Sequence, residues 1–205
     1  MTAALQHDIE LRRGATYVLP VRWETAPWLY AAIASISLTA PVAITSAAHA
    51  IPDGWKVAVV DAKGLTQLNA KNNPPKASDM RRATVVSATQ IEFNEISAAA
   101  FGKHQAGSGY LAWLTPHTLI GYAARLQIKD RVGGAVLLSL TTENGGIALD
   151  DGGKVIEISI TAAQTEALTK SAGVYDLELV SPGGVVTALL EGAVSVASEV
   201  TTPTV

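Results

Sequence analysis

Short segments that alternate apolar and polar residues recur along almost the whole chain, and turn-forming residues separate them. The clearest are residues 122–128, 154–160 and 174–180. Alternation with a period of two residues is typical of a β-strand that buries one face. The intervening turns are rich in glycine, proline and aspartate, as in residues 181–184 (Ser-Pro-Gly-Gly). Strands at this spacing predict an all-β protein of the sandwich or barrel type.

Helical signals are scarce, and the best one covers residues 161–168. Thr161 is a suitable N-cap, Gln164 follows it at the spacing of a capping box, and Gly173 lies beyond the end. Residues 97–101 are long enough for a single helical turn. We therefore expect one short helix in a chain made mostly of strands.

The chain carries few charges. Charged residues make up 16% of its 205 residues and the formal net charge is −3, so no basic surface for nucleic acid is expected. The densest basic spots are the doublets Arg12-Arg13 and Arg81-Arg82. We expect these doublets to be solvated strand edges, with a phosphate clamp as the alternative. A surface with so few charges suits a subunit that packs among others.

Several kinds of segment and site are not expected. The chain has no cysteine, which excludes disulfides, thiolate nucleophiles and thiolate metal ligands. No stretch approaches the roughly 20 apolar residues that span a bilayer, and polar residues alternate through the alanine-rich run 31–50. The first residues lack the basic and apolar regions of a signal peptide. We expect no membrane span and synthesis in the cytoplasm.

A series of turn and strand motifs lies in the first half of the chain. They are Ala-His-Ala-Ile at 48–51, Asp-Gly at 53–54, Gly-Leu-Thr-Gln-Leu-Asn at 64–69, Ala-Thr-Val-Val at 83–86, Ile-Glu-Phe at 91–93 and Gly-Ser-Gly-Tyr at 107–110. Residues 33–113 thereby resemble the small β-barrel first named from a half-domain of ubiquitin-activating enzymes, in the form common in phage tail proteins. Ala50 replaces the glycine that this family prefers, and the Pro74-Pro75 loop departs from its pattern. The resemblance implies a barrel but no chemistry.

A second series of motifs follows residue 122. They are Ala-Arg-Leu-Gln-Ile at 124–128, Leu-Thr-Thr-Glu-Asn-Gly-Gly-Ile at 140–147, Ile-Thr-Ala at 160–162, Gly-Val-Tyr-Asp-Leu-Glu-Leu at 173–179 and Gly-Ala-Val-Ser-Val at 192–196. This region resembles small immunoglobulin-like sandwich proteins of the phage tail or baseplate, and residues 13–21 resemble the first strands of the same sandwich. The few strands before residue 30 cannot bury a core alone. We therefore expect a discontinuous sandwich of residues 1–30 and 116–205, with a small β-barrel of residues 31–115 inserted.

Both resemblances imply a non-enzymatic structural subunit of a bacteriophage particle, at the tail tip, baseplate or fibre attachment point. The alternatives are a capsid or neck decoration protein and a tail protein that binds or cleaves host-surface glycans. The implied location is the virion, and the implied partners are other virion proteins and copies of itself in a symmetric homo-oligomer. We expect the sandwich to be the anchor. The barrel would project outward with its loop 70–79, which its two prolines predict to be the least ordered stretch.

The histidines and one aspartate pair are the first candidates for a metal site. His7, His49, His104 and His117 lack the spacing of metal ligands, and we expect the ring of His49 to bond to nearby backbone. Residues 150–153 (Asp-Asp-Gly-Gly) resemble the start of a calcium loop but lack its later oxygen ligands. A β-turn is the preferred interpretation.

No catalytic constellation is recognisable. The pairs Glu92 with Glu95 and Asp176 with Glu178 have no cleft assigned to them by sequence, and Ser108 lacks the nucleophile-elbow pattern. Glycine pairs stand between predicted strands rather than before helices, which disfavours phosphate binding; they are 133–134, 145–146, 152–153 and 183–184. We therefore expect no catalytic, cofactor-binding or metal-binding residue.

Aromatic residues gather where the two predicted domains meet in sequence. Trp23, Trp28 and Tyr30, together with Pro27, lie before the barrel, and Trp113 and Tyr122 lie at its end. We expect an interdomain core. A partner-binding hot spot is the alternative, because Trp and Tyr dominate such patches.

Overall fold

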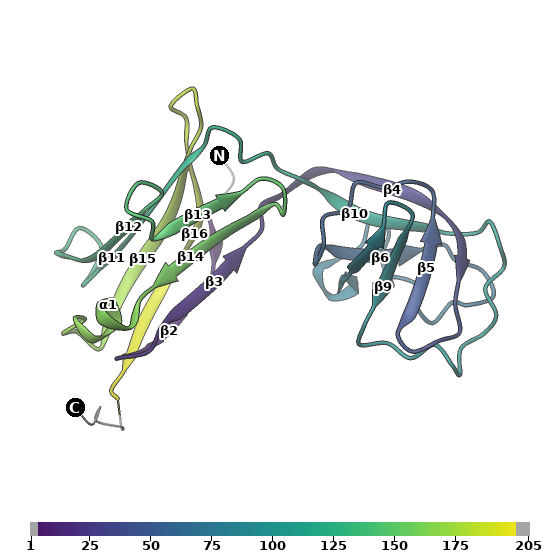
Figure 1. Cartoon of the computed structure of the whole chain (residues 1–205), viewed down its shortest axis with the longest axis horizontal. Helices are drawn as coiled ribbons and strands as arrows, with labels where there is room; N and C mark the ends of the chain where they lie inside the picture. Colours follow the sequence, from purple (N-terminus) through teal and green to yellow (C-terminus); the bar gives the residue numbers. More distant parts are fainter. Residues whose placement is uncertain (1–3, 200–205) are drawn as a thin grey trace. The chain divides into compact units, whose positions relative to one another are not determined.

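The computed structural model describes residues 4–199 and divides the chain into two units, one of which interrupts the other in sequence. Of these, residues 4–23 and 118–199 form the sandwich unit, and the continuous segment Glu24–His117 forms the barrel unit (Figure 1). Within the described residues, the helical elements are one five-residue α-helix and one three-residue 3₁₀ turn. The all-β prediction is confirmed.

Two sheets form the sandwich unit. The larger sheet has the order β1-β16-β15-β11-β12, with β2 also paired to β16, and the smaller has the order β13-β14-β3. Pairing is antiparallel except that β1 and β2 run parallel to β16. The strands are β1 (Leu5–Gln6), β2 (Ile9–Arg12), β3 (Tyr17–Val21), β11 (Ala123–Lys129), β12 (Val136–Thr141), β13 (Ile147–Asp150), β14 (Val155–Ile160), β15 (Ala172–Val180) and β16 (Val186–Ala197).

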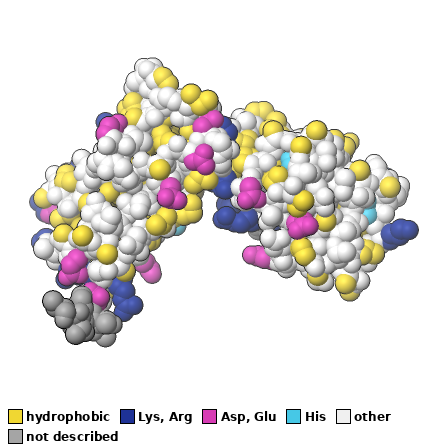
Figure 2. Space-filling view, in the orientation of Figure 1, with side chains coloured by type: hydrophobic (Ala, Val, Ile, Leu, Met, Phe, Trp, Pro, Cys, Tyr) yellow, Lys and Arg dark blue, Asp and Glu magenta, His cyan; other side chains and the backbone are white. Residues whose placement is uncertain are grey.

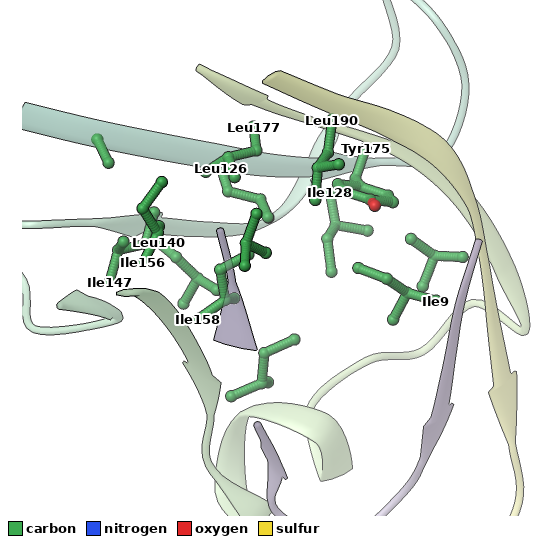
Figure 3. Close-up of a cluster of buried hydrophobic side chains, with 14 of the residues drawn as sticks. Ile9, Leu126, Ile128, Leu140, Ile147, Ile156, Ile158, Tyr175, Leu177 and Leu190 are labelled. Carbon is green, nitrogen blue, oxygen red and sulfur yellow. The ribbon is translucent and has the colours of Figure 1, made fainter. Parts of the chain in front are cut away.

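Apolar side chains of the two sheets meet between them as the core of the sandwich unit (Figure 3). Leu126 and Leu177 of the larger sheet and Ile156 and Ile158 of the smaller sheet are each no more than 1% exposed. Successive side chains of a strand point to opposite faces, so the alternation in the sequence places every second residue in this core. Burying each such side chain contributes about 1.5–3 kcal/mol.

Strands β1 and β2 both pair with β16, and His7 lies in the short connection between them. A Cβ on Gly192 would lie 2.2 Å from the carbonyl oxygen of His7, so only glycine allows the chains to approach this closely. The same oxygen accepts a 2.7 Å hydrogen bond from the hydroxyl of the buried Tyr175. Burial, with Tyr17 and Asp8 nearby, raises the pKa of Tyr175 to about 12. The tyrosine of the 173–179 motif thus fastens the amino-terminal strands to the sheet.

The predicted helix forms as α1 (Ala162–Glu166), which begins after its N-cap Thr161 and ends two residues before the expected end at residue 168. The capping box is present: Thr161 Oγ1 accepts from the Gln164 N–H at 3.2 Å, and Gln164 Oε1 accepts from the Thr161 N–H at 2.8 Å. The fully buried Thr165 donates to the carbonyl of Ala15 at 2.9 Å. The Leu168 N–H bonds to the Thr165 carbonyl, three residues back, which tightens the last turn and ends the helix.

A single sheet that is nearly closed forms the barrel unit. Its order is β7-β6-β10-β4-β5-β9-β8, and the two edge strands are separated in sequence by Ala83 alone. Ala83 exchanges backbone hydrogen bonds with Trp55 and Gly54. Trp55 and Phe93 are among the largest side chains of the enclosed core. The elements are β4 (Glu24–Ile36), β5 (Val42–Ser46), β6 (Lys56–Val60), the 3₁₀ turn η1 (Ala77–Asp79), β7 (Arg81–Arg82), β8 (Thr84–Ser87), β9 (Gln90–Phe93) and β10 (Tyr110–Pro116).

The barrel unit begins seven residues earlier than its predicted start at residue 31. Strand β4 runs from Glu24 to Ile36 and pairs with β10, with Glu24 opposite Pro116. Pro27 interrupts the sequence pattern, because proline cannot donate to a ladder. It is accommodated where the register between the two strands shifts. The unit ends at His117, two residues beyond its predicted end.

Candidate interaction surfaces

Two of the four histidines bond to loops of the barrel unit. His49 Nδ1 accepts from the Ile51 N–H at 3.3 Å, as predicted for its turn, and burial lowers the pKa of His49. His104 Nε2 lies 2.9 Å from the carbonyl oxygen of Ser108. His7 is exposed between β1 and β2, and His117 is half-buried. Among residues 4–199, no group of three or more His, Asp or Glu side chains is arranged to hold a metal ion.

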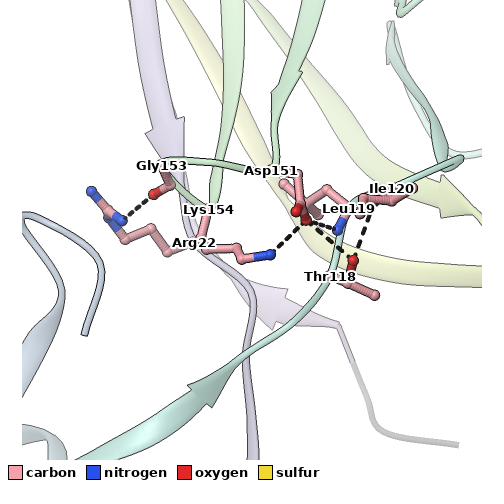
Figure 4. A network of polar contacts seen from close by, with 7 residues as sticks. All are labelled: Arg22, Thr118, Leu119, Ile120, Asp151, Gly153 and Lys154. Carbon is pink, nitrogen blue, oxygen red and sulfur yellow. Dashed lines mark hydrogen bonds and ion pairs between the residues drawn. The ribbon is translucent and has the colours of Figure 1, made fainter. Parts of the chain in front are cut away.

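The glycine pairs lie in turns between strands, as predicted. The pairs 133–134, 145–146, 152–153 and 183–184 join β11 to β12, β12 to β13, β13 to β14 and β15 to β16. Asp150 is the last residue of β13, and residues 151–153 belong to the turn that follows it. The carboxylate of Asp151 accepts hydrogen bonds from the Leu119 N–H and from the Lys154 ammonium group (Figure 4). Ser108 Oγ accepts from the Lys63 N–H at 3.0 Å and donates to the Gln105 carbonyl at 2.6 Å. These contacts give Ser108 a role in shaping its loop.

Half of each arginine doublet is engaged with backbone. Arg13 donates to the carbonyl of Thr169 at 3.1 Å, and Arg81 donates to the carbonyl of Asp79 at 3.0 Å. The exposed members are Arg12 at the end of β2 and Arg82, which stands opposite Lys56 across β6 and β7. The prediction of solvated strand edges therefore describes one residue of each doublet.

The 140–147 motif forms the turn between β12 and β13, and its Asn144 covers part of an open edge. Strand β12 is the last strand of the larger sheet. Asn144 Oδ1 accepts from the Thr141 N–H at 2.9 Å, and Asn144 Nδ2 donates to the Ser139 carbonyl at 3.0 Å. The side-chain amide takes the place of a neighbouring strand and blunts the edge. Sequence reasoning missed Asn144, because its role depends on the path of the turn.

A buried carboxylate organises the loop 71–79 of the barrel unit. Asp79, which is 6% exposed, accepts from the side chain of Asn72 at 2.9 Å and from the N–H groups of Lys76 and Lys71 at 3.0 and 3.1 Å. The hydrogen bond from Asn72 and those from the backbone lower the pKa of Asp79 to about 2. The segment is a loop rather than a strand, as predicted, but its backbone is held at several points. Asp79 was also missed from the sequence.

The outer face of the larger sheet carries a polar row that crosses four strands. Its members are paired in register from β11 to β1: Gln127, Asp176, Glu191 and Gln6. They line a depression of about 430 Å³ together with Lys129. Glu178 shares this face and forms an ion pair with Arg125 at 2.6 Å. The other suspected pair is Glu92, half-buried in β9, and Glu95, exposed beyond it.

The aromatic residues belong to three different surroundings. Trp23 packs edge-to-face on Tyr122 within the sandwich unit, with ring centroids 5.8 Å apart. Trp113 is buried in the core of the barrel unit. Trp28 is half-buried in β4, and Tyr30 is 47% exposed. Of the predicted set, Tyr30 is the aromatic side chain most available to a partner.

Tyr30 has an aromatic neighbour on the outer face of the barrel that sequence reasoning did not single out. Tyr110 in β10 stands opposite Ala32, and Tyr30 stands opposite Ala112, so the two tyrosines occupy diagonal positions on one face. Tyr110 is 46% exposed. The small alanine side chains leave the tyrosine rings uncovered by their cross-strand partners. Such rings suit stacking and hydrogen bonding with a partner; we call Tyr30 and Tyr110 the tyrosine pair.

The surface visible in Figure 2 is mostly uncharged. Hydrophobic side chains lie in scattered patches, and acidic and basic side chains are few. No helix within residues 4–199 has the length and apolar character needed to cross a bilayer. Comparison with known protein families and with curated proteins gives no match to this chain.

Proposed function

We propose that this protein is a non-enzymatic structural subunit of a bacteriophage particle, located at the tail tip, baseplate or fibre attachment point. One observation carries the proposal. The two segments that resemble different phage modules fall into two separate β-units: residues 33–113 lie in one, and the described residues 122–199 with 13–21 lie in the other. The two units are separate in space for reasons of packing alone, so their agreement with the two resembling segments supports a chain made of two modules.

The outer surfaces support an assembly role. The larger sheet ends in β12, an edge without charged residues that Asn144 covers only in part. An uncharged edge of this kind is suited to contacts with other subunits. In this proposal the sandwich unit anchors the protein among copies of itself and other virion proteins, and the barrel unit projects with loop 71–79.

Antibody labelling of particles purified from cells that make the protein tests this proposal. We expect label at the tail, and a particle reconstruction should then show a symmetric ring of copies. Label on the capsid or neck would favour the decoration alternative over the tail position. A protein that is absent from purified particles would overturn the structural role altogether.

A second candidate function, binding of host-surface glycans, is favoured by the tyrosine pair. Exposed aromatic rings with polar hydroxyl groups can stack on sugar rings and hydrogen-bond to their hydroxyls. Titration of host-surface polysaccharide into the protein tests this function. Binding should be lost in the variant Tyr30→Ala/Tyr110→Ala and kept in Leu38→Ala, a control for loss of an exposed side chain of the same unit. Absence of binding in the unaltered protein, or equal binding by both variants, would eliminate this candidate.

A further inference from the structure

The second arginine doublet lines a depression of about 370 Å³ in the surface of the barrel unit. The depression lies where β7, the start of β8 and the end of β9 come together, and its volume is sufficient for a small organic group. Its lining includes two arginines, two neutral polar side chains, a carboxylate and a phenyl ring: Arg81, Arg82, Thr84, Asn94, Glu95 and Phe93. We call it the arginine depression.

Arg82 lies beside a second positive charge. It stands opposite Lys56 in the pairing of β6 with β7, and both side chains are exposed. Like charges directly opposite each other on neighbouring strands are unfavourable. Within residues 4–199, neither side chain takes part in an ion pair. A bound anion would offset this repulsion, so the pair attracts negative charge to this part of the barrel unit.

The hydroxyl group of Thr84 supplies a neutral donor beside Arg82. Asn94 Nδ2 donates to Thr84 Oγ1 at 2.9 Å, so the hydroxyl is the acceptor in that contact and its own hydrogen is available to another partner. Ala83 between the two residues is fully buried, and alternate residues of an extended chain point to the same side. The guanidinium group of Arg82 and the hydroxyl of Thr84 therefore share one face, as donors to an oxyanion must.

Arg81 is held in place from the side of loop 71–79. The half-buried guanidinium donates from Nη1 to the carbonyl of Asp79 at 3.0 Å. The carboxylate of Asp79 is in turn fixed by donors from Asn72, Lys71 and Lys76. The contact with the carbonyl uses one of the five N–H donors of Arg81. An arginine that is already fixed can bind an anion with little further loss of side-chain freedom.

We propose that the arginine depression binds a carboxylate group that is attached to an apolar body. The guanidinium group of Arg82 and the hydroxyl of Thr84 donate to the carboxylate oxygens, and Lys56 and Arg81 add positive charge. The ring of Phe93, which is 2% exposed and lines the depression, forms an apolar floor for the body of the ligand. The inference is independent of the proposed function, because it concerns one depression of the barrel unit.

Glu95 favours a carboxylate over a phosphate group. Its exposed side chain lines the same depression. A phosphate ester carries a charge of about −1.5 to −2 at neutral pH, so Glu95 repels it more strongly than it repels a group with a single negative charge. The phosphate clamp considered for this doublet is therefore the weaker assignment.

Titration of the full-length protein with benzoate, which has one carboxylate on an apolar ring, tests the site. Nuclear magnetic resonance should show saturable shifts of the amide resonances of residues 80–84 and 93–96. Arg82→Gln should raise the Kd by about tenfold or more, because it removes a charge-assisted hydrogen bond. Arg12→Gln makes the same change at the exposed arginine of the other doublet and should leave the Kd unchanged.

A peptide that ends in phenylalanine distinguishes a polypeptide terminus from a small acid as the source of the carboxylate. Tighter binding of the peptide than of benzoate, lost when its terminus is amidated, would assign the site to a chain terminus. Equal or weaker binding of the peptide would assign it to a small acid.

Three outcomes would overturn the proposal: no saturable shifts with benzoate or the peptide, equal weakening in Arg12→Gln and Arg82→Gln, and tighter binding of inorganic phosphate than of benzoate. Circular dichroism verifies that each variant is folded. Should Arg82→Gln fail to fold, Thr84→Val serves in its place, because it removes the hydroxyl and keeps the shape of the side chain. Unchanged benzoate binding in Thr84→Val would then reject the site.

Discussion

The sandwich unit and the barrel unit bury comparable apolar cores but close them differently. In the sandwich unit two open sheets pack face to face. In the barrel unit one sheet curves round so that its two edge strands, β7 and β8, are separated only by Ala83. Open sheets leave edges that other groups must cover, and a closed sheet removes them. The stability of the sandwich unit therefore depends on contacts between the inner faces of its sheets and on groups that cover its edges. The stability of the barrel unit depends on its enclosed core and on the loops that connect its short strands.

In each unit an asparagine side chain replaces a missing backbone partner. Asn69 of the barrel unit accepts from the N–H of Ala62 at 3.0 Å and donates to the carbonyl of the same residue at 2.9 Å. Asn144 does the same for two residues of the β12 edge. Asn69 lies in the 64–69 motif and Asn144 in the 140–147 motif, so each motif contains a residue whose side chain stabilises the backbone.

The largest expected effect on stability comes from removing a large side chain from the barrel core. Trp55 is fully buried, and its indole N–H donates to the Leu114 carbonyl at 3.0 Å. Trp55→Ala should destabilise the barrel unit by about 3–5 kcal/mol. Amide hydrogen exchange followed by nuclear magnetic resonance should show faster exchange in residues 24–117 and unchanged exchange in the sandwich unit. Loss of protection in both units together would show that they unfold as one.

The anchoring of the amino-terminal strands is the next largest effect. Tyr175→Phe removes the hydroxyl that bonds to His7 and leaves a carbonyl oxygen without this partner, at a cost of about 1–2 kcal/mol. Urea unfolding of the sandwich unit measures the loss. Tyr110→Phe makes the same change on an exposed ring and should stay within about 0.5 kcal/mol of the unaltered protein. Equal effects of the two variants would contradict the assigned role of Tyr175.

Substitution of each asparagine compares a buried backbone partner in the barrel unit with a solvent-exposed strand edge in the sandwich unit. Asn69→Ala leaves the backbone of the buried Ala62 without its partner and should destabilise the barrel unit by about 1 kcal/mol. Asn144→Ala exposes the β12 edge to water, which replaces the lost hydrogen bonds, so its effect should be smaller. Its second expected effect is self-association, because an unblunted edge can pair with another copy. Thermal unfolding and sedimentation velocity measure these two effects.

The smallest expected effect is the response of loop 71–79 to acid. The folded-state pKa of Asp79 is lowered to about 2, below the roughly 3.9 of an unfolded aspartate. The stabilisation by this carboxylate is therefore fully present above about pH 4 and is lost as the pH falls towards about 2. The amide resonances of Lys71 and Lys76 should shift with that midpoint, and they should not titrate in Asp79→Asn. A midpoint at the ordinary aspartate value would contradict the hydrogen-bond network.

Much of the sandwich unit could be predicted because its strands have one buried face. The predicted strands 122–128 and 174–180 alternate clearly, and they correspond to β11 (Ala123–Lys129) and β15 (Ala172–Val180). Residues on both sides of Glu191 form one long strand, β16, because Gly192 allows the close approach of His7 and does not form a turn. The barrel was harder to predict. Four successive residues of β6, from Val57 to Val60, are buried, so period-two alternation is lost.

Tyr30 was predicted as a member of the aromatic set, but the tyrosine pair was not. Nothing in the local sequence pairs Tyr30 with Tyr110, which lies 80 residues later. Their common face follows from the register of β4 and β10. The same holds for the row from Gln127 to Gln6, whose members come from both ends of the chain.

The sequence alone determined the all-β class, the capped helix and the loop at 71–79, because these depend on alternation, spacing and proline, which act over a few residues. Tertiary structure decided where β4 begins, which strands close the barrel, and which polar side chains meet at Asp151 and Asp79. These features depend on strand register and on hydrogen bonds between segments that are distant in sequence. The packing of each unit determines which residues become partners, and the local sequence pattern does not predict them.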